Sequence, residues 1–136
     1  MDKGYKILEH IADVRVQAFG KTKEELFLNA TRGMTTILRP KLKDKKEKIK
    51  KKIKVKSVDL NSLLVDFLSE VLYQIQTNKE IYNNVKFTNF SDTNLKGELI
   101  GNKVESFGED IKAVTYHGLK IEKSENGFQS TILLDI

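Results

Sequence analysis

The stretch LLVDFLSEVLYQI, residues 63–75, carries the strongest periodic signal in the sequence. Apolar residues recur there at intervals of three and four, which places them on one face of an α-helix. Ser57 and Asp59 are candidate N-caps, because their side-chain oxygens can accept the free N–H groups of a first helical turn. The broad stripe predicts a helix that packs into the core and organises the fold. Its members are Leu63, Leu64, Phe67, Leu68, Val71, Leu72 and Ile75.

A second amphipathic helix is predicted upstream, over residues 23–39. The segment Thr22-Lys23-Glu24-Glu25 matches a capping box, with a hydroxyl at the N-cap and a carboxylate three residues later. Pro40 follows and cannot continue the helix, because proline has no backbone N–H. One face of this helix is apolar and is formed by Leu26, Phe27, Ala30, Met34, Ile37 and Leu38.

Alternation of apolar and polar residues, the period of a half-buried strand, recurs through the rest of the chain. The pair Asn126-Gly127 predicts a hairpin between the last two strands. In the segment 114–122 the apolar residues change from even to odd positions at His117-Gly118. This change in apolar parity predicts a β-bulge there. Strands are expected over residues 5–10, 14–19, 49–56, 85–87, 95–104, 114–122 and 128–136.

This order of elements predicts the α+β class. We expect a two-layer sandwich in which two helices cover one face of a mostly antiparallel sheet. A length of 136 residues with no internal repeat fits a single domain over residues 1–136. The chain has no cysteine, which excludes disulfides, thiolate metal sites and cysteine nucleophiles. No apolar run is long enough to span a membrane and no signal pattern opens the sequence, so a cytoplasmic protein is expected.

Charge is concentrated in one segment, residues 41–56 (KLKDKKEKIKKKIKVK). It holds ten lysines against two acidic residues, although the whole chain carries a net charge of only +5. Ile49, Ile53 and Val55 share one parity, which predicts a strand whose opposite face, including Lys50 and Lys52, is turned to solvent. Such a face could contact the phosphates of a nucleic acid, or it could be a solvated edge that prevents unwanted strand pairing.

The acidic residues near the end of the sequence offer a possible cation site. The apolar alternation of the last strand continues to Ile136, so we expect the α-carboxylate to be held near the sheet, beside the carboxylate of Asp135. Asp13, in a turn between two predicted strands, could supply a third anionic group. Three oxygen ligands would suit a hard cation such as Ca²⁺ or Mg²⁺. From the residues alone, two surface acids and an ordinary terminus are the favoured interpretation.

The chain contains two histidines, His10 and His117. His10 lies three residues before Asp13, a spacing that could serve a base and its orienting acid, a metal site or a simple turn cap. A small hydrolase using these three residues is therefore conceivable. No nucleophile motif, P-loop or zinc spacing accompanies them.

Several blocks, in this order, resemble the archease family and span nearly the whole chain. The block Lys112–Leu119 resembles the most distinctive block of the family. Together the blocks are specific, although any one alone would not be. They are His10–Asp13, Lys21–Phe27 with Ala30 and Gly33-Met34, Leu63–Tyr73, Lys112–Leu119 and Leu133–Ile136.

The resemblance implies an accessory protein, not an enzyme, that assists an RtcB-type ligase in tRNA splicing. Members of the family promote guanylylation of the ligase and its repeated turnover. Carried over to this sequence, the metal ligands would be Asp13, Asp135 and the terminal carboxylate of Ile136, with Ca²⁺ the expected ion and Mg²⁺ or Mn²⁺ as alternatives. Lys112 matches a lysine important for activity, and His10 and His117 lie in the same blocks. The alternative function is a basic RNA-binding module acting through residues 41–56.

Overall fold

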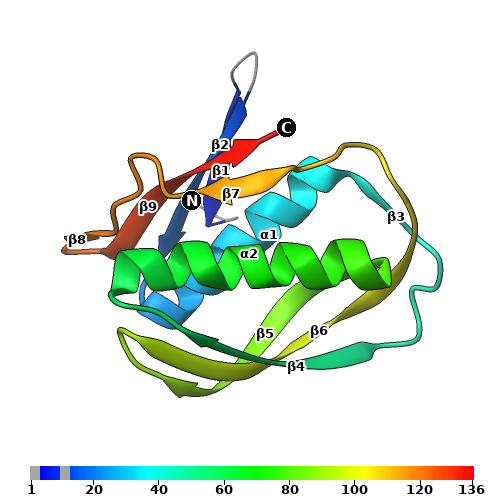
Figure 1. The fold of residues 1–136 in the computed structure, drawn as a ribbon, viewed down its shortest axis with the longest axis horizontal. Coiled ribbons are helices and arrows are strands. Elements are labelled where there is room, and N and C mark those ends of the chain that lie inside the picture. Colours follow the sequence, from blue (N-terminus) through cyan, green and yellow to red (C-terminus); the bar gives the residue numbers. More distant parts are fainter. Residues whose placement is uncertain (1–3, 10–12) are drawn as a thin grey trace.

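The structure, a computed structural model, describes residues 4–9 and 13–136 (Figure 1). Within these residues it has two helices, α1 (Lys23–Leu38) and α2 (Leu60–Asn78). The α+β class, the two helices and the antiparallel pairing are confirmed. Neither helix is long and apolar enough to cross a membrane. The strands are β1 (Tyr5–Glu9), β2 (Asp13–Gly20), β3 (Pro40–Leu42), β4 (Ile49–Lys56), β5 (Glu80–Phe90), β6 (Asn94–Phe107), β7 (Ala113–Thr115), β8 (Glu122–Ser124) and β9 (Gly127–Asp135).

The strands form two antiparallel sheets instead of the single sheet expected. The first sheet has the order β1-β2-β9-β7, with β8 also pairing β9, and in the second β6 pairs with β3, β4 and β5. Helix α1 contacts β2 and β5, and α2 contacts β4, β5 and β7, so each helix touches both sheets. In Figure 1 the first sheet lies above the helices and the second below. The wide apolar stripes of the helices are thus covered on two sides.

Both helices begin where their sequences predict. The Thr22 hydroxyl accepts the N–H of Glu25 at 3.1 Å, and the Glu25 carboxylate accepts the N–H of Lys21 at 3.2 Å. Asp59, rather than Ser57, caps α2, and its carboxylate accepts the N–H of Ser62 at 2.7 Å. This hydrogen bond favours the ionised form and lowers the pKa of Asp59.

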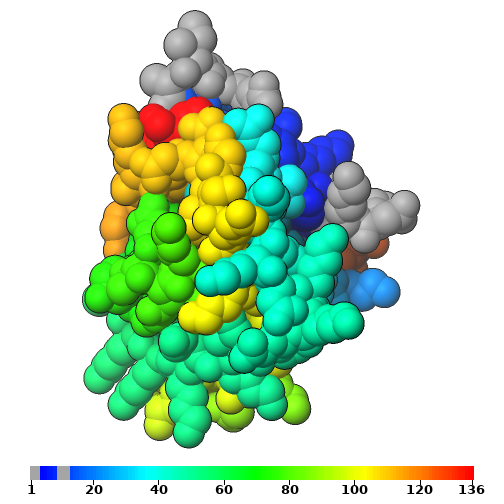
Figure 2. Space-filling model, turned by 90° about the vertical axis from the view of Figure 1, so that its right-hand side faces the viewer, coloured from blue at the N-terminus to red at the C-terminus, as the bar shows by residue number. Residues whose placement is uncertain are grey.

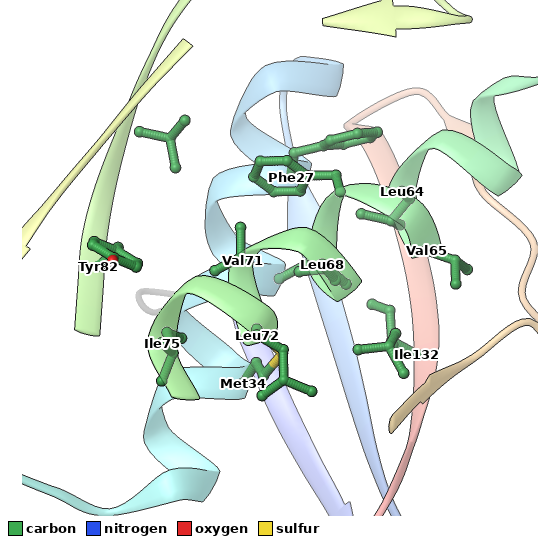
Figure 3. Packing of buried hydrophobic residues seen from close by; sticks show 14 of the residues in the cluster. Phe27, Met34, Leu64, Val65, Leu68, Val71, Leu72, Ile75, Tyr82 and Ile132 are labelled. Atoms are coloured by element: carbon green, nitrogen blue, oxygen red, sulfur yellow. The ribbon is translucent and has the colours of Figure 1, made fainter. Parts of the chain in front are cut away.

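The predicted stripe of α2 is buried in full, together with Val65 (Figure 3). Four aromatic rings join the two helices to β5. The ring of Phe27 lies 5.4 Å from that of Phe67 and 5.0 Å from that of Phe90, and Phe67 lies 5.8 Å from Phe87. Tilted and edge-on contacts of this kind add to the stabilisation that apolar burial provides.

The strand predicted over residues 114–122 is interrupted, so the prediction of a β-bulge was wrong. Of this segment, only β7 and the first residue of β8 pair with β9, and residues 116–121 leave the sheet between them. Gly118 has a φ of +66°, a conformation that glycine adopts without strain. The change in apolar parity therefore marks a loop rather than an extra residue within a continuous strand.

Helix α2 holds this loop in place. The Tyr116 hydroxyl donates a hydrogen bond to the Asp66 carboxylate, which raises the pKa of Tyr116. The Asn61 side chain accepts the N–H of Ile121 at 2.9 Å. These side-chain acceptors replace the ladder bonds that a continuous strand would have made, which is why periodicity alone did not reveal the break.

We predict that Phe67→Ala lowers the free energy of unfolding by about 3–5 kcal/mol, because it opens a cavity between α1, α2 and β5. Tyr73→Ala, on the same helix but 59% exposed, should change it by no more than about 0.5 kcal/mol. Urea denaturation of both variants measures the difference. Equal losses would contradict the placement of Phe67 at the centre of the core.

Candidate functional site

Two of the predicted site residues meet across the first sheet. Asp13, the first residue of β2, is the direct cross-strand partner of Asp135, the last residue of β9. Directly opposed residues of antiparallel strands carry their side chains on the same face, with Cβ atoms about 4.5–5.5 Å apart. The pairing therefore places the two carboxylates side by side, and Ile136 follows directly.

A third strand brings Lys112 to the same end of the sheet. Its backbone N–H donates to the Asp135 carbonyl oxygen at 2.7 Å, and the next residue, Ala113, is the register partner of Asp135. The Lys112 side chain is exposed. This end of the sheet thus brings together four of the predicted site residues, which are Asp13, Lys112, Asp135 and Ile136.

The chain leading to Lys112 is fixed by both helices. The Gln76 side chain on α2 donates to the carbonyl of Ile111 at 2.8 Å and to the Asp110 carboxylate at 3.4 Å. At the end of α1, the Arg39 guanidinium donates to the carbonyl of Gly108 at 2.8 Å. The Ile111 side chain is fully buried. The position of Lys112 is therefore set by the core and not by a free loop.

A cavity of about 420 Å³ opens beside the chain end. The Arg39 guanidinium and the Glu109 carboxylate face each other across part of it at 3.7 Å. Arg39 is a site residue that the sequence analysis missed. The sequence feature that could have pointed to Arg39 is its position directly before Pro40. In the structure Arg39 ends α1 in a left-handed conformation with φ 45°. The lining includes Ile7, Val14, Ile37, Arg39, Glu109 and Ile136.

The histidines do not join this group in the part of the chain that the structure describes. His117 lies in the exposed turn after β7, where its backbone N–H donates to the Thr115 hydroxyl at 3.3 Å. Asp135 pairs with Ala113 at the start of β7, whereas His117 follows the end of β7. His10 lies outside the described residues. The hydrolase arrangement of His10, Asp13 and His117 therefore gains no support.

The donors at the chain end are all oxygens. Among the residues described, 4–9 and 13–136, no three His, Asp or Glu side chains lie close enough together to hold a metal ion. A cation at this end would have two aspartates and a main-chain carboxylate as its protein ligands. This donor set fits a hard ion such as Ca²⁺, which completes its shell with carbonyls and water.

Comparison with known proteins places this chain in a family. The model of the Archease protein family (MTH1598/TM1083) matches residues 5–136. A protein archease from Methanosarcina barkeri is 35% identical over 142 residues, covering 98% of this chain and 97% of the relative. One from Saccharolobus islandicus is 31% identical over 141 residues, covering 98% and 99%.

Two solved structures share the fold. The solution structure of Methanobacterium thermoautotrophicum protein 1598 aligns with a TM-score of 0.72 at 25% identity, covering 98% of this chain and 99% of that one. The crystal structure of a Thermotoga maritima archease, described as a possible chaperone, aligns with a TM-score of 0.72 at 20% identity, covering 96% of each. Because the family model spans nearly the whole chain and relatives above 30% identity align along 98% of it, this chain belongs to the archease family.

Proposed function

We propose that this protein is an accessory factor of an RtcB-type RNA ligase in tRNA splicing, promoting guanylylation of the ligase and its repeated turnover. The observation that carries the proposal is the meeting of Asp13, Asp135 and Lys112 at one end of the first sheet. Membership of the archease family supports it. The Thermotoga relative, described as a possible chaperone, likewise suggests action on a partner protein. A role beside a tRNA ligase would be exercised in the cytoplasm.

The proposed metal ligands are the carboxylates of Asp13 and Asp135 and the main-chain carboxylate of Ile136. Two carboxylates on directly paired residues repel each other unless positive charge lies between them. A divalent cation, Ca²⁺ first and Mg²⁺ or Mn²⁺ as alternatives, would offset that repulsion and neutralise phosphate charge, which phosphoryl transfer requires. The backbone bond from Lys112 to Asp135 keeps the end of β9 in place whether or not an ion is bound.

Lys112 supplies the mobile positive charge of the proposed site. Its backbone is held by the Asp135 carbonyl, while its exposed side chain forms no ion pair with the residues that the structure describes. An ammonium group acts as a compact point charge on a flexible stem. Lys112 is thus free to contact a nucleotide phosphate or a carboxylate of the ligase. Catalysis itself belongs to the ligase.

We predict that Ca²⁺ raises the melting temperature of the unmodified protein relative to a chelator. An ion present at a hundredfold excess over its Kd adds about 2.7 kcal/mol to the free energy of unfolding. Asp13→Ala and Asp135→Ala should lose this metal-dependent shift without unfolding in chelator, because removing one acid relieves like-charge repulsion. Thermal melts in Ca²⁺, Mg²⁺ and chelator measure it, and Glu122→Ala, an exposed acid on β8, is the matched control.

A C-terminal extension of a few residues tests the third ligand. It converts the carboxylate of Ile136 into an amide, so we expect it to abolish the metal-dependent shift and most stimulation of the ligase. An N-terminal extension of equal length should preserve both. A C-terminally extended protein that still gains the full shift would remove Ile136 from the ligand set.

We predict that Lys112→Ala folds normally and reduces ligase stimulation at least tenfold, because the site loses its point charge. The measurement is the rate of guanylylation of a matching RtcB-type ligase with GTP, with and without this protein. Lys123→Ala on β8, also exposed, should stimulate normally. Full stimulation by the Lys112 variant would contradict its assignment to the site.

A further inference from the structure

The outward face of β4 is a line of lysines. Lys50, Lys52, Lys54 and Lys56 are all exposed, and Ile53 and Val55 between them are buried. This confirms the parity predicted for Lys50 and Lys52. With a rise of about 3.4 Å per residue, successive ammonium groups are anchored about 7 Å apart along the strand. In Figure 2 the segment containing β4 projects long side chains from the lower part of the molecule.

Two neighbouring strands extend this line into a field of charge. The register places Lys52, Glu98 and Lys86 in one row across β4, β6 and β5, and Lys54 beside Lys96 in the next row. Register partners share a face of the sheet, so the lysines of all three strands point the same way. We call this surface the lysine face; its basic members are Lys50, Lys52, Lys54, Lys56, Lys86 and Lys96.

No lysine of the lysine face forms an ion pair with the residues that the structure describes. In the described part of the chain, the ion pairs formed by lysines involve Lys23, Lys41, Lys51 and Lys103, none of which belongs to this face. The face is hollowed by a cavity of about 520 Å³. Its lining includes Lys52, Lys54, Lys86, Thr88, Lys96 and Glu98.

The residues that line this cavity indicate which kind of partner the lysine face fits. No aromatic residue lines it, so it offers no platform on which unpaired bases could stack. Protein interfaces are poor in lysine and rich in aromatic residues, the opposite of this surface. Regularly spaced ammonium groups without stacking residues match the phosphate backbone of a nucleic-acid duplex, whose binding is electrostatic and independent of sequence.

We propose that the lysine face binds the phosphate backbone of a folded, double-helical RNA. The choice of RNA over DNA rests on the proposed function, since the substrate of a tRNA-splicing ligase is a folded RNA. The face lies at the end of the molecule opposite the C-terminus (Figures 1 and 2). RNA held there leaves Asp13, Asp135 and Lys112 accessible to the ligase, so this chain can contact substrate and enzyme at once.

The test measures binding of a fluorescent tRNA transcript and of an RNA duplex to the protein alone, by anisotropy, across a salt series. We expect Lys52→Gln/Lys86→Gln/Lys96→Gln to weaken binding at least tenfold at low salt. The slope of log affinity against log salt should fall by about one for each lysine removed. Because all three side chains are exposed, an unchanged thermal melt is expected.

The matched control is Lys43→Gln/Lys45→Gln/Lys46→Gln, which removes the same charge from the exposed loop between β3 and β4. It should reduce affinity far less than the variant of the face. Glu98→Gln should increase affinity, because it removes the acid at the centre of the lysine field. Equal losses in the two triple variants would overturn the proposal, because binding would then follow net charge alone.

Two other results would also overturn the proposal. They are absence of RNA binding at low salt and weakened affinity of the face variant for the ligase in the absence of RNA. The proposed function is tested separately by guanylylation of the ligase without RNA. Normal stimulation by a variant that no longer binds RNA would leave the ligase role standing, while RNA binding without any stimulation would reject the ligase role and keep the lysine face.

Discussion

The antiparallel pairing of β2 with β9 is the constraint on which the site and much of the fold depend. It joins an early strand to the last one through continuous register from Asp13↔Asp135 to Gly20↔Phe128. One side of this pair supplies the buried residues Val16, Ile132 and Leu134 to the core. At one end of the pair, Asp13 lies directly opposite Asp135. The burial that stabilises the pair thus also brings these two acids together at one end of the first sheet.

Helix α2 forms part of the core and also holds two loop segments in place. Its apolar stripe fills the space between the sheets, and its polar side chains hold two segments of irregular backbone. Gln76 fixes the chain before β7, while Asp66 and Asn61 fix the loop after it. Backbone groups that leave a sheet need other partners, and here one rigid helix provides them. Lys112 therefore enters β7 from a defined position even though β7 itself is only three residues long.

The end of the first sheet that carries the paired aspartates lies at the opposite end of the molecule from the lysine face. Paired aspartates lie where β2 and β9 meet, and the lysine face covers the outer side of β4, β6 and β5. Because the two groups lie far apart, they do not neutralise one another. A net charge of +5 conceals this division, because an average says nothing about where charge lies.

The sequence by itself determined the two helices, their caps, the alternation of β4 and the antiparallel α+β class, because these follow from side-chain periodicity and capping chemistry within short segments. The residues suggested that Asp13 could join Asp135 as a cation ligand. Resemblance to a family, rather than periodicity, strengthened that prediction and pointed to Lys112. Only the tertiary structure decided that β2 pairs with β9, that the strands divide into two sheets and that residues 116–121 leave the sheet to bond α2. It likewise placed Lys86 and Lys96 beside the lysines of β4. Local patterns show which face of a strand is buried, but the choice of its neighbours depends on how all the apolar faces of the domain cover one another.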